Sequence, residues 1–305
     1  MKVAIIGAGN VGAQSALLIL KQDLADIVLL DIQKDLAQAK AMDLSDAGAI
    51  LGYSSKVVGT DDYRAINGAE IVVITAGFTR KPGMTREELL EKNAQIIKEV
   101  VEKIKIYAPQ SIIIVVTNPL DVLTYLALKL SNFPPARVMG MAGVLDSARF
   151  SVQISALLNK PSAKIKTVIL GSHSERMLIL SRLSDYRQEK IVHLLKPEEL
   201  KSAEERTRKR GTEIVELLKG GSAFFAPSAA VFKMVEAILK DKKEIMPVCS
   251  YLDGQYGLKD ITLGTLASIG KAGIEEIVEL DLTAEEKNLL QKSALEILSL
   301  YKKIK

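Results

Sequence analysis

The amino-acid sequence predicts an α/β fold in which a doubly wound parallel sheet is followed by a second, α+β domain. In residues 1–141, short apolar runs rich in Val and Ile alternate with longer segments of helical period, which is typical of consecutive β-α-β units. These runs lack polar alternation, as expected of strands that helices cover on both faces. Beyond residue 145 the alternation is less strict, and we expect the second domain there.

The first domain is expected to span residues 1–144. Its apolar runs, the predicted strands, fall at residues 2–6, 27–30, 56–59, 71–75, 111–116 and 137–141. Predicted helices separate them at residues 11–20, 34–50, 86–107 and 119–130. Strands and helices linked in this order make a complete doubly wound domain of the Rossmann type.

The second, α+β domain is expected to span residues 145–305. Helices are predicted near residues 147–158, 198–218 and 225–240, and strands near 165–171, 244–251 and 261–268. A last helix begins after Thr283, because Thr283 and Glu286 have the spacing of a capping box before an apolar run. No stretch rich in Pro and Gly separates the two domains, so we expect them to pack tightly.

Composition excludes several classes of protein. Apolar residues make up 48% of the chain and the charges nearly balance, so the chain is neither disordered nor collagen-like. The one cysteine, Cys249, cannot form a disulfide framework or a Cys-built metal site. The net charge of +4 is spread along the chain, which argues against nucleic acid. No run approaches the ~18 apolar residues that cross a bilayer, and no signal-peptide pattern is present. We expect a cytoplasmic protein without membrane, nucleic-acid or metal partners.

A glycine-rich turn joins the first predicted strand to the first predicted helix. The strand runs into a G-x-G-x-x-G pattern, Gly7-Ala8-Gly9-Asn10-Val11-Gly12. Gly7 permits the tight turn, Gly9 lets a pyrophosphate approach the backbone, and Gly12 lets the helix pack closely on the strand. The N-terminus of the helix then offers unpaired N–H groups to the phosphates.

Asp31 lies at the end of the second predicted strand. A carboxylate there accepts hydrogen bonds from the adenosine ribose and repels a 2′-phosphate, which favours NAD over NADP. The alternative interpretation is a helix N-cap for the segment that follows. A dinucleotide alone does not define the chemistry, because dehydrogenases, epimerases and regulatory sensors share this half of the fold.

Only two histidines are candidates for proton transfer near neutral pH, His173 and His193. His193 has apolar neighbours and is interpreted as structural, whereas His173 follows an apolar run where a side chain emerges at a strand end. Asp146 and Arg149 lie three residues apart on one face of a predicted helix start. They could serve His173, or they could be a helix-dipole acid and its local ion pair.

Two further segments follow predicted strands at the edge of the sheet where ligands bind in open α/β folds. The segment from Arg80 to Arg86 holds three cations, a proline and a glycine, which indicates a loop that closes over an anion. Asn118 follows the fifth strand and is placed to donate a hydrogen bond at that edge.

Six motifs occur together in one order along the chain: Gly7–Gly12, Thr75–Gly77, Arg80–Arg86, Thr117–Asp121, Leu145–Phe150 and Gly171–His173. This set resembles the lactate/malate dehydrogenase family, and within it the lactate-dehydrogenase-like malate dehydrogenases, over nearly the whole chain. The resemblance implies a homodimer or homotetramer, and the apolar stretches 11–20 and 225–240 are candidate interfaces.

The resemblance also implies a role for each matched residue. His173 is the general acid/base, Asp146 orients its imidazole, and Arg149 binds the C1 carboxylate of the substrate. Arg86 polarises the substrate carbonyl and Asn118 orients the substrate hydroxyl. Besides the glycines and Asp31, the implied cofactor-binding positions are Ala8, Asn10, Val11, Thr75, Ala76, Gly77, Asn93, Val116, Thr117 and Asn118.

Arg80 determines the expected substrate. The resemblance implies that lactate-specific members of the family have a neutral Gln at this position. A second guanidinium here instead suits a substrate with a second carboxylate. An unpaired buried cation facing a methyl group would be costly, so we expect ~3–5 kcal/mol of discrimination in favour of malate and oxaloacetate. The small residue Ala223 supports the longer acid. The alternative is that Arg80 only adds positive potential to its loop.

Three other functions remain open at this point. The nearest is a lactate or other 2-hydroxy-acid dehydrogenase with the same mechanism. An NAD- and metal-dependent glycosidase would need a Cys/His metal pair, which Cys249 does not have in a matching motif. An inactive dinucleotide sensor would leave the Asp146, Arg149 and His173 set unexplained. One position departs from the family, which usually has Gly after the catalytic histidine, whereas this chain has Ser174.

Overall fold

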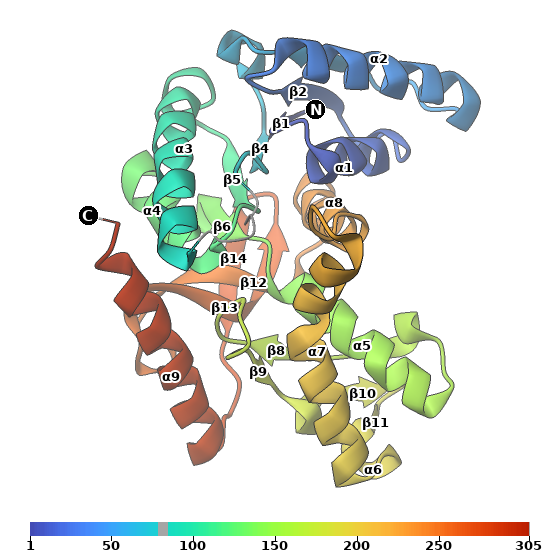
Figure 1. The fold of residues 1–305 in the computed structure, drawn as a ribbon, viewed down its shortest axis with the longest axis vertical. Coiled ribbons are helices and arrows are strands. Elements are labelled where there is room, and N and C mark those ends of the chain that lie inside the picture. The colour runs from blue at the N-terminus through green and yellow to red at the C-terminus, as the bar shows by residue number, and fades with distance from the viewer. Residues whose placement is uncertain (79–84, 305) are drawn as a thin grey trace.

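The computed structural model describes residues 1–78 and 85–304, and within them the largest sheet has nine strands (Figure 1). The strand order is β14-β13-β12-β6-β5-β4-β1-β2-β3. The parallel part contains β1 (Lys2–Ile6), β2 (Asp26–Leu30), β3 (Val57–Thr60), β4 (Ile71–Ile74), β5 (Ile112–Val115) and β6 (Val138–Gly140). Three antiparallel strands continue the sheet beyond β6, namely β12 (Glu244–Asp253), β13 (Lys259–Gly270) and β14 (Gly273–Val278).

Five of the parallel strands, β1, β2, β4, β5 and β6, are buried on both faces, as the lack of polar alternation predicted, whereas the edge strand β3 is partly exposed, with Val58 open to solvent. Ala4 and Ile6 of β1 belong to one apolar core, whereas Val3 and Ile5 belong to the core on the other face. The first core is completed by α3 (Arg86–Tyr107), α4 (Leu120–Ser131) and α9 (Ala284–Tyr301). The second core is completed by α1 (Asn10–Leu20), α2 (Lys34–Leu51) and α8 (Phe225–Leu239).

A third core lies at the end of the molecule opposite α2 (Figure 1). It is built from α5 (Gly143–Leu158), α6 (Ile191–Leu194), α7 (Pro197–Leu218) and short strands. The short strands are β7 (Ile165–Lys166), β8 (Ile169–Leu170), β9 (Leu178–Ile179), β10 (Asp185–Tyr186) and β11 (Glu189–Lys190). Turns of 3₁₀ helix occur at Tyr63–Ile66, Pro135–Arg137, Ser162–Lys164, Ser181–Leu183 and Gln255–Gly257. The α/β class with a second α+β region is thus confirmed.

The predicted single strand at 165–171 is wrong. The chain divides there into β7, which pairs with β10, and β8, which pairs with β9. Between them the hydroxyl of Thr167 donates to the carbonyl oxygen of Ser147 at 2.8 Å, so this residue is anchored on α5 instead of extending a strand. The sequence did not predict β9, β10, β11, β14 or α6; four of these five have two to four residues, and such short segments carry little periodicity.

Helix α5 begins at Gly143, earlier than the predicted 147, so the expected boundary between residues 144 and 145 falls inside its first turn. Helices α1 and α8 pack together, and Ser228 Oγ donates to the carbonyl oxygen of Val11 at 2.9 Å. The apolar stretches considered as subunit interfaces therefore contact each other within one chain. Among the described residues, no helix is long and apolar enough to cross a membrane.

Candidate active site

The glycine-rich turn has the shape that a dinucleotide requires. Gly7 has a φ of 111°, which L side chains rarely adopt, and a Cβ at Gly12 would overlap the carbonyl oxygen of Gly7. A Cβ at Gly9 would have no heavy atom within 4 Å, so the backbone is open on that side. Helix α1 begins at Asn10 without a side-chain cap, which leaves its first N–H groups facing the turn. These features fit a pyrophosphate at the helix N-terminus.

Asp31 follows β2 and reaches the same turn. Its Oδ2 accepts the N–H of Ala8 at 2.7 Å, and its Oδ1 accepts the N–H of Gln33 at 3.0 Å. The helix N-cap interpretation is wrong, because the N-cap of α2 is Gln33. The half-buried carboxylate keeps further lone pairs that can accept ribose hydroxyls.

Asn93 holds two loops of the sheet edge side by side. It is fully buried, and its amide accepts the N–H of Phe78 at 2.7 Å while donating to the carbonyl oxygen of Asn118 at 2.7 Å. Thr117 supports the same contact, since its Oγ1 donates to the carbonyl oxygen of Ala76 at 2.7 Å. The side-chain amide of Asn93 therefore binds backbone groups and holds together the loops that follow β4 and β5.

The remaining predicted cofactor positions lie along this edge. Thr75 Oγ1 donates to the carbonyl oxygen of Gly7 at 2.9 Å, which ties the loop after β4 to the glycine turn. A Cβ at Gly77 would overlap the side chain of Thr117, so glycine is required there. Asn118 is exposed, and its Oδ1 accepts the N–H of Leu120 at 3.3 Å. That bond turns the NH₂ group of Asn118 toward other acceptors. Half-buried positions are Val11, Ala76 and Val116, and Asn10 is exposed.

The structure brings His173, Asp146 and Arg149 together. The Nδ1 atom of His173 lies 2.7 Å from Oδ2 of Asp146, and Nη1 of Arg149 lies 3.3 Å from Oδ1 of the same carboxylate. Asp146 is 2% exposed, whereas the side chains of His173 and Arg149 are 15% and 13% exposed. An ionised Asp146 makes Nδ1 the protonated nitrogen, which leaves Nε2 for a ligand.

Two opposing effects set the pKa of His173. Burial of the ring lowers the pKa, but the charge and hydrogen bond of Asp146, together with the charge of Asp121, raise it more. The net pKa is above the ordinary value of 6.5. The imidazolium is therefore stabilised near neutral pH, as a proton donor requires.

Asp121 is a site residue to which the sequence analysis assigned no role. Its Oδ2 accepts the backbone N–H of His173 at 2.8 Å, and its Oδ1 has no hydrogen-bond partner among the residues that the structure describes. Burial raises the pKa of Asp121 to about 6. The available signal was a lone acid within an apolar run, between Leu120 and Val122.

Two predicted substrate residues cannot be placed. Arg80 lies outside the described residues, and so does the side chain of Arg86, although α3 begins at that residue. The start of α3 is well defined, because Thr85 and Glu88 form a reciprocal capping box. The closing loop and the roles of both arginines stay predictions.

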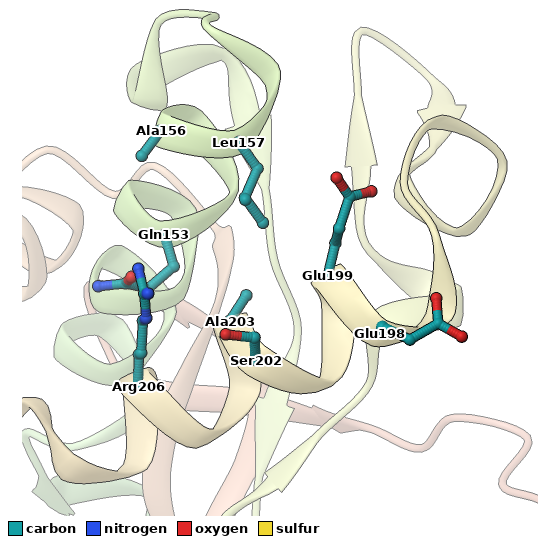
Figure 2. Close-up of a pocket in the computed structure, with 8 residues that line it drawn as sticks. All are labelled: Gln153, Ala156, Leu157, Glu198, Glu199, Ser202, Ala203 and Arg206. Carbon is teal, nitrogen blue, oxygen red and sulfur yellow. The ribbon is translucent and has the colours of Figure 1, made fainter.

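Residues of α7 line two clefts. One, of about 440 Å³, lies between α5 and α7, and Figure 2 shows Leu157 and Ala203 extending from the two helices into that space. The other, of about 740 Å³, is lined by Gln153 of α5, by Glu175 of the turn that carries His173, and by α7. Gln153 follows Arg149 by one helical turn, so the larger cleft is close to the expected carboxylate-binding residue.

The doubly wound sheet and the phosphate-binding turn define a dinucleotide-binding fold, and beside it lies a mostly buried His–Asp–Arg group. The sequence model of the lactate/malate dehydrogenase NAD binding domain matches residues 1–140, and that of the lactate/malate dehydrogenase alpha/beta C-terminal domain matches residues 143–305. The chain belongs to the lactate/malate dehydrogenase family, and NAD is its cofactor.

Individual relatives cover nearly the whole chain. The malate dehydrogenase of Desulforudis audaxviator is 45% identical over 292 residues, which are 96% of this chain and 94% of that protein. The crystal structure of Cryptosporidium parvum malate dehydrogenase is similar with a TM-score of 0.97 and 37% identity, covering 99% of this chain and 98% of that one. C. parvum lactate dehydrogenase complexed with lactic acid and NAD has a TM-score of 0.96 and 38% identity, covering 99% and 97%. The fold alone therefore does not separate the two activities.

Proposed function

We propose that this protein is an NAD-dependent malate dehydrogenase. It converts (S)-malate and NAD⁺ into oxaloacetate, NADH and a proton, and the reaction is reversible. The observation that carries the proposal is the His173–Asp146 pair beside Arg149, in a chain that is 45% identical to a malate dehydrogenase. A lactate dehydrogenase is the second candidate, because a solved lactate dehydrogenase is nearly as similar in fold as the malate dehydrogenase.

The residues divide the chemistry of the reaction between them. In reduction, Nε2 of His173 donates its proton to the carbonyl oxygen of oxaloacetate as that oxygen gains charge, and Asp146 keeps the ring oriented. In oxidation, the neutral Nε2 takes the hydroxyl proton of malate. The nicotinamide, when bound, supplies or accepts the hydride. His173 thus needs one protonation state for each direction, which a pKa near the working pH allows.

Arginine side chains are the proposed ligands of the two carboxylates. Arg149 binds the C1 carboxylate, and its low exposure supports this, since a largely desolvated guanidinium needs an anion beyond its 3.3 Å contact with Asp146. We assign the C4 carboxylate to Arg80 and the carbonyl oxygen to Arg86. Asn118 donates its NH₂ group to the substrate hydroxyl.

The cofactor lies along the sheet edge in this proposal. Asp31 accepts the ribose hydroxyls, and the glycine turn binds the pyrophosphate. The proposed cofactor-binding residues are Gly7, Ala8, Gly9, Asn10, Val11, Gly12, Asp31, Thr75, Ala76, Gly77, Asn93, Val116, Thr117 and Asn118.

Three further features belong to the same proposal. Residues 1–144 form the NAD-binding domain and residues 145–305 the substrate domain, and the chain assembles as a homodimer or homotetramer. The cytoplasm is the proposed compartment.

An assay of NADH oxidation with oxaloacetate and with pyruvate, side by side, tests this function. We expect kcat/KM to be higher for oxaloacetate by about 10²–10³-fold, because only the dicarboxylate pairs a second guanidinium. A preference for pyruvate would instead identify a lactate dehydrogenase. NADH binding without turnover of either acid would identify a dinucleotide sensor.

A further inference from the structure

A chain of four polar side chains runs beside His173 and ends on α9. The Oγ atoms of Ser293 and Ser172 lie 2.8 Å apart, those of Ser172 and Ser174 lie 2.8 Å apart, and Oγ of Ser174 lies 3.3 Å from Oε2 of Glu296. Ser172 and Ser174 flank His173 in sequence, whereas Ser293 and Glu296 lie on α9. The two residues around the proposed acid/base are therefore both attached to the last helix.

The hydrogen bonds in this series of side chains can all have the same donor-to-acceptor direction. Oγ of Ser293 accepts the backbone N–H of Ser172 at 2.7 Å and donates its own proton to Oγ of Ser172. The hydroxyl of Ser172 is then free to donate to Ser174, and that of Ser174 to Glu296. A carboxylate only accepts, so Glu296 terminates the series, and hydrogen bonds in such a row strengthen one another.

Ser174 is the link that makes this chain continuous. Its Oγ also accepts the backbone N–H of Arg176 at 3.1 Å, and Nε of Arg176 lies 3.5 Å from Oε2 of Glu296. Ser172 and Ser293 are fully buried, so an unpaired hydroxyl at Ser172 would be costly. A glycine at position 174 would remove the acceptor for both Ser172 and Arg176.

We propose that Ser174 is a positioning residue that holds the turn of His173 against α9 and so keeps Nε2 aimed at the substrate. The other supports of His173 are Asp121, which binds its backbone N–H, and Asp146, which binds its ring. Neither of them restrains the backbone that follows His173, and Ser174 does. This inference rests on the proposed role of His173 as the general acid/base.

The expected effect is moderate, because the other supports remain. A shift of about 1 Å in a reacting group can cost about 10²-fold in rate. Losing one of several supports should therefore lower kcat for oxaloacetate reduction by about 3–30-fold. Binding of NADH should not change, because the chain of hydroxyls contacts none of the glycine-turn residues.

The experiment compares Ser174→Ala, Ser174→Gly and Ser174→Thr with the wild-type protein. Ser299→Ala is the matched control, because Ser299 is an exposed serine of α9 whose hydroxyl donates to the carbonyl oxygen of Glu296 within the same helix. The measurements are kcat with NADH and with 4-deuterated NADH, the Kd of NADH from fluorescence, and Tm. The isotope effect shows whether hydride transfer limits the rate.

We expect Ser174→Ala and Ser174→Gly to lower kcat, with a larger isotope effect and an unchanged Kd for NADH. Ser174→Thr retains the hydroxyl and should restore most of the activity, and Ser299→Ala should match the wild type. Glu296→Gln should lower kcat less than Ser174→Ala, and the double variant Ser174→Ala/Glu296→Gln should be no worse than Ser174→Ala alone, because both changes break the same chain.

Three results would overturn the inference: wild-type kcat in Ser174→Ala, an equal loss in Ser174→Thr, or a loss of kcat that follows losses of NADH affinity and Tm. Failure of the proposed function has a different signature. If the proposed function is wrong, the wild-type protein itself does not turn over oxaloacetate. If only the inference about Ser174 is wrong, the wild type is active and the Ser174 variants give one of the three results above.

Discussion

The cofactor edge and the turn of His173 are built in different ways. In the glycine turn of the cofactor edge, backbone shape is decisive and the residues concerned are neighbours in sequence, from Gly7 to Gly12, although Asp31 and Thr75 contact this turn from the ends of other strands. Around His173 the supports come from distant segments, with Asp121 on α4, Asp146 on α5 and Ser293 on α9. A short stretch of sequence is therefore enough to predict the glycine turn, whereas the arrangement around His173 depends on tertiary packing.

His173→Ala should separate the two regions most strongly. We expect kcat to fall by about 10²–10⁴-fold, because proton transfer is lost, while the glycine turn still binds NADH. Steady-state rates and fluorescence titration with NADH measure the two effects. Loss of NADH affinity in this variant would mean that the regions are not independent and that His173 has another role.

Asp146→Asn keeps the shape of the buried side chain and removes its charge. The charge and hydrogen bond of Asp146 raise the pKa of His173, so the variant should have a lower pKa at this histidine. Oxaloacetate reduction needs the protonated ring, so in this variant the rate should decline at a lower pH than in the wild type. The rate itself should fall by up to about 10²-fold. A pH profile of kcat/KM checks this, and an unshifted profile would contradict the assigned pairing.

Asp121→Asn should have a smaller effect on rate, about tenfold or less, because Asn can still accept the N–H of His173. Its clearer consequence concerns stability. The folded pKa of about 6 lies above the ordinary 3.8, so the charged form is disfavoured on folding. The stability that this group contributes is therefore present below pH 3.8 and lost as pH rises through about 6, by about 3 kcal/mol.

The free energy of unfolding, measured from pH 4 to pH 7 in both proteins, tests this. Between pH 4 and pH 7 the free energy of unfolding of the wild type should fall relative to that of Asp121→Asn by about 2 kcal/mol, because part of the loss already occurs below pH 4. If the difference in free energy of unfolding between the two proteins did not change with pH, the pKa of Asp121 would not be raised to about 6 by burial.

Asp31→Ser is expected to change the choice of cofactor more than the rate of turnover. It should reduce the preference for NAD over NADP by about tenfold, since a carboxylate repels the 2′-phosphate and a hydroxyl does not. Asp31 also accepts the N–H of Ala8, so NAD affinity should weaken slightly as well. The ratio of kcat/KM for NADH and NADPH is the readout, and an unchanged ratio would remove Asp31 from ribose recognition.

The fold was largely predictable because parallel strands are short apolar runs and the helices between them are long. The strand at 165–171 failed, since an apolar run does not reveal that Thr167 is anchored on Ser147 and that β7 and β8 have different partners. The contact between Asp146 and Arg149 was predictable, because the two residues lie three positions apart on one helix. Asp121, Ser293 and Glu296 were not, because their contacts with the turn of His173 join residues 52 or more positions apart.

The most direct test of the central claim is an NMR titration of His173 in the absence of ligands. The chain has two histidines, so His173→Ala identifies the two imidazole signals without ambiguity. The carboxylates around the ring should give His173 a pKa above 6.5 in the wild type, and Asp146→Asn should bring it down. A wild-type value at or below 6.5, unmoved by Asp146→Asn, would contradict the acid–base centre on which the proposed function depends.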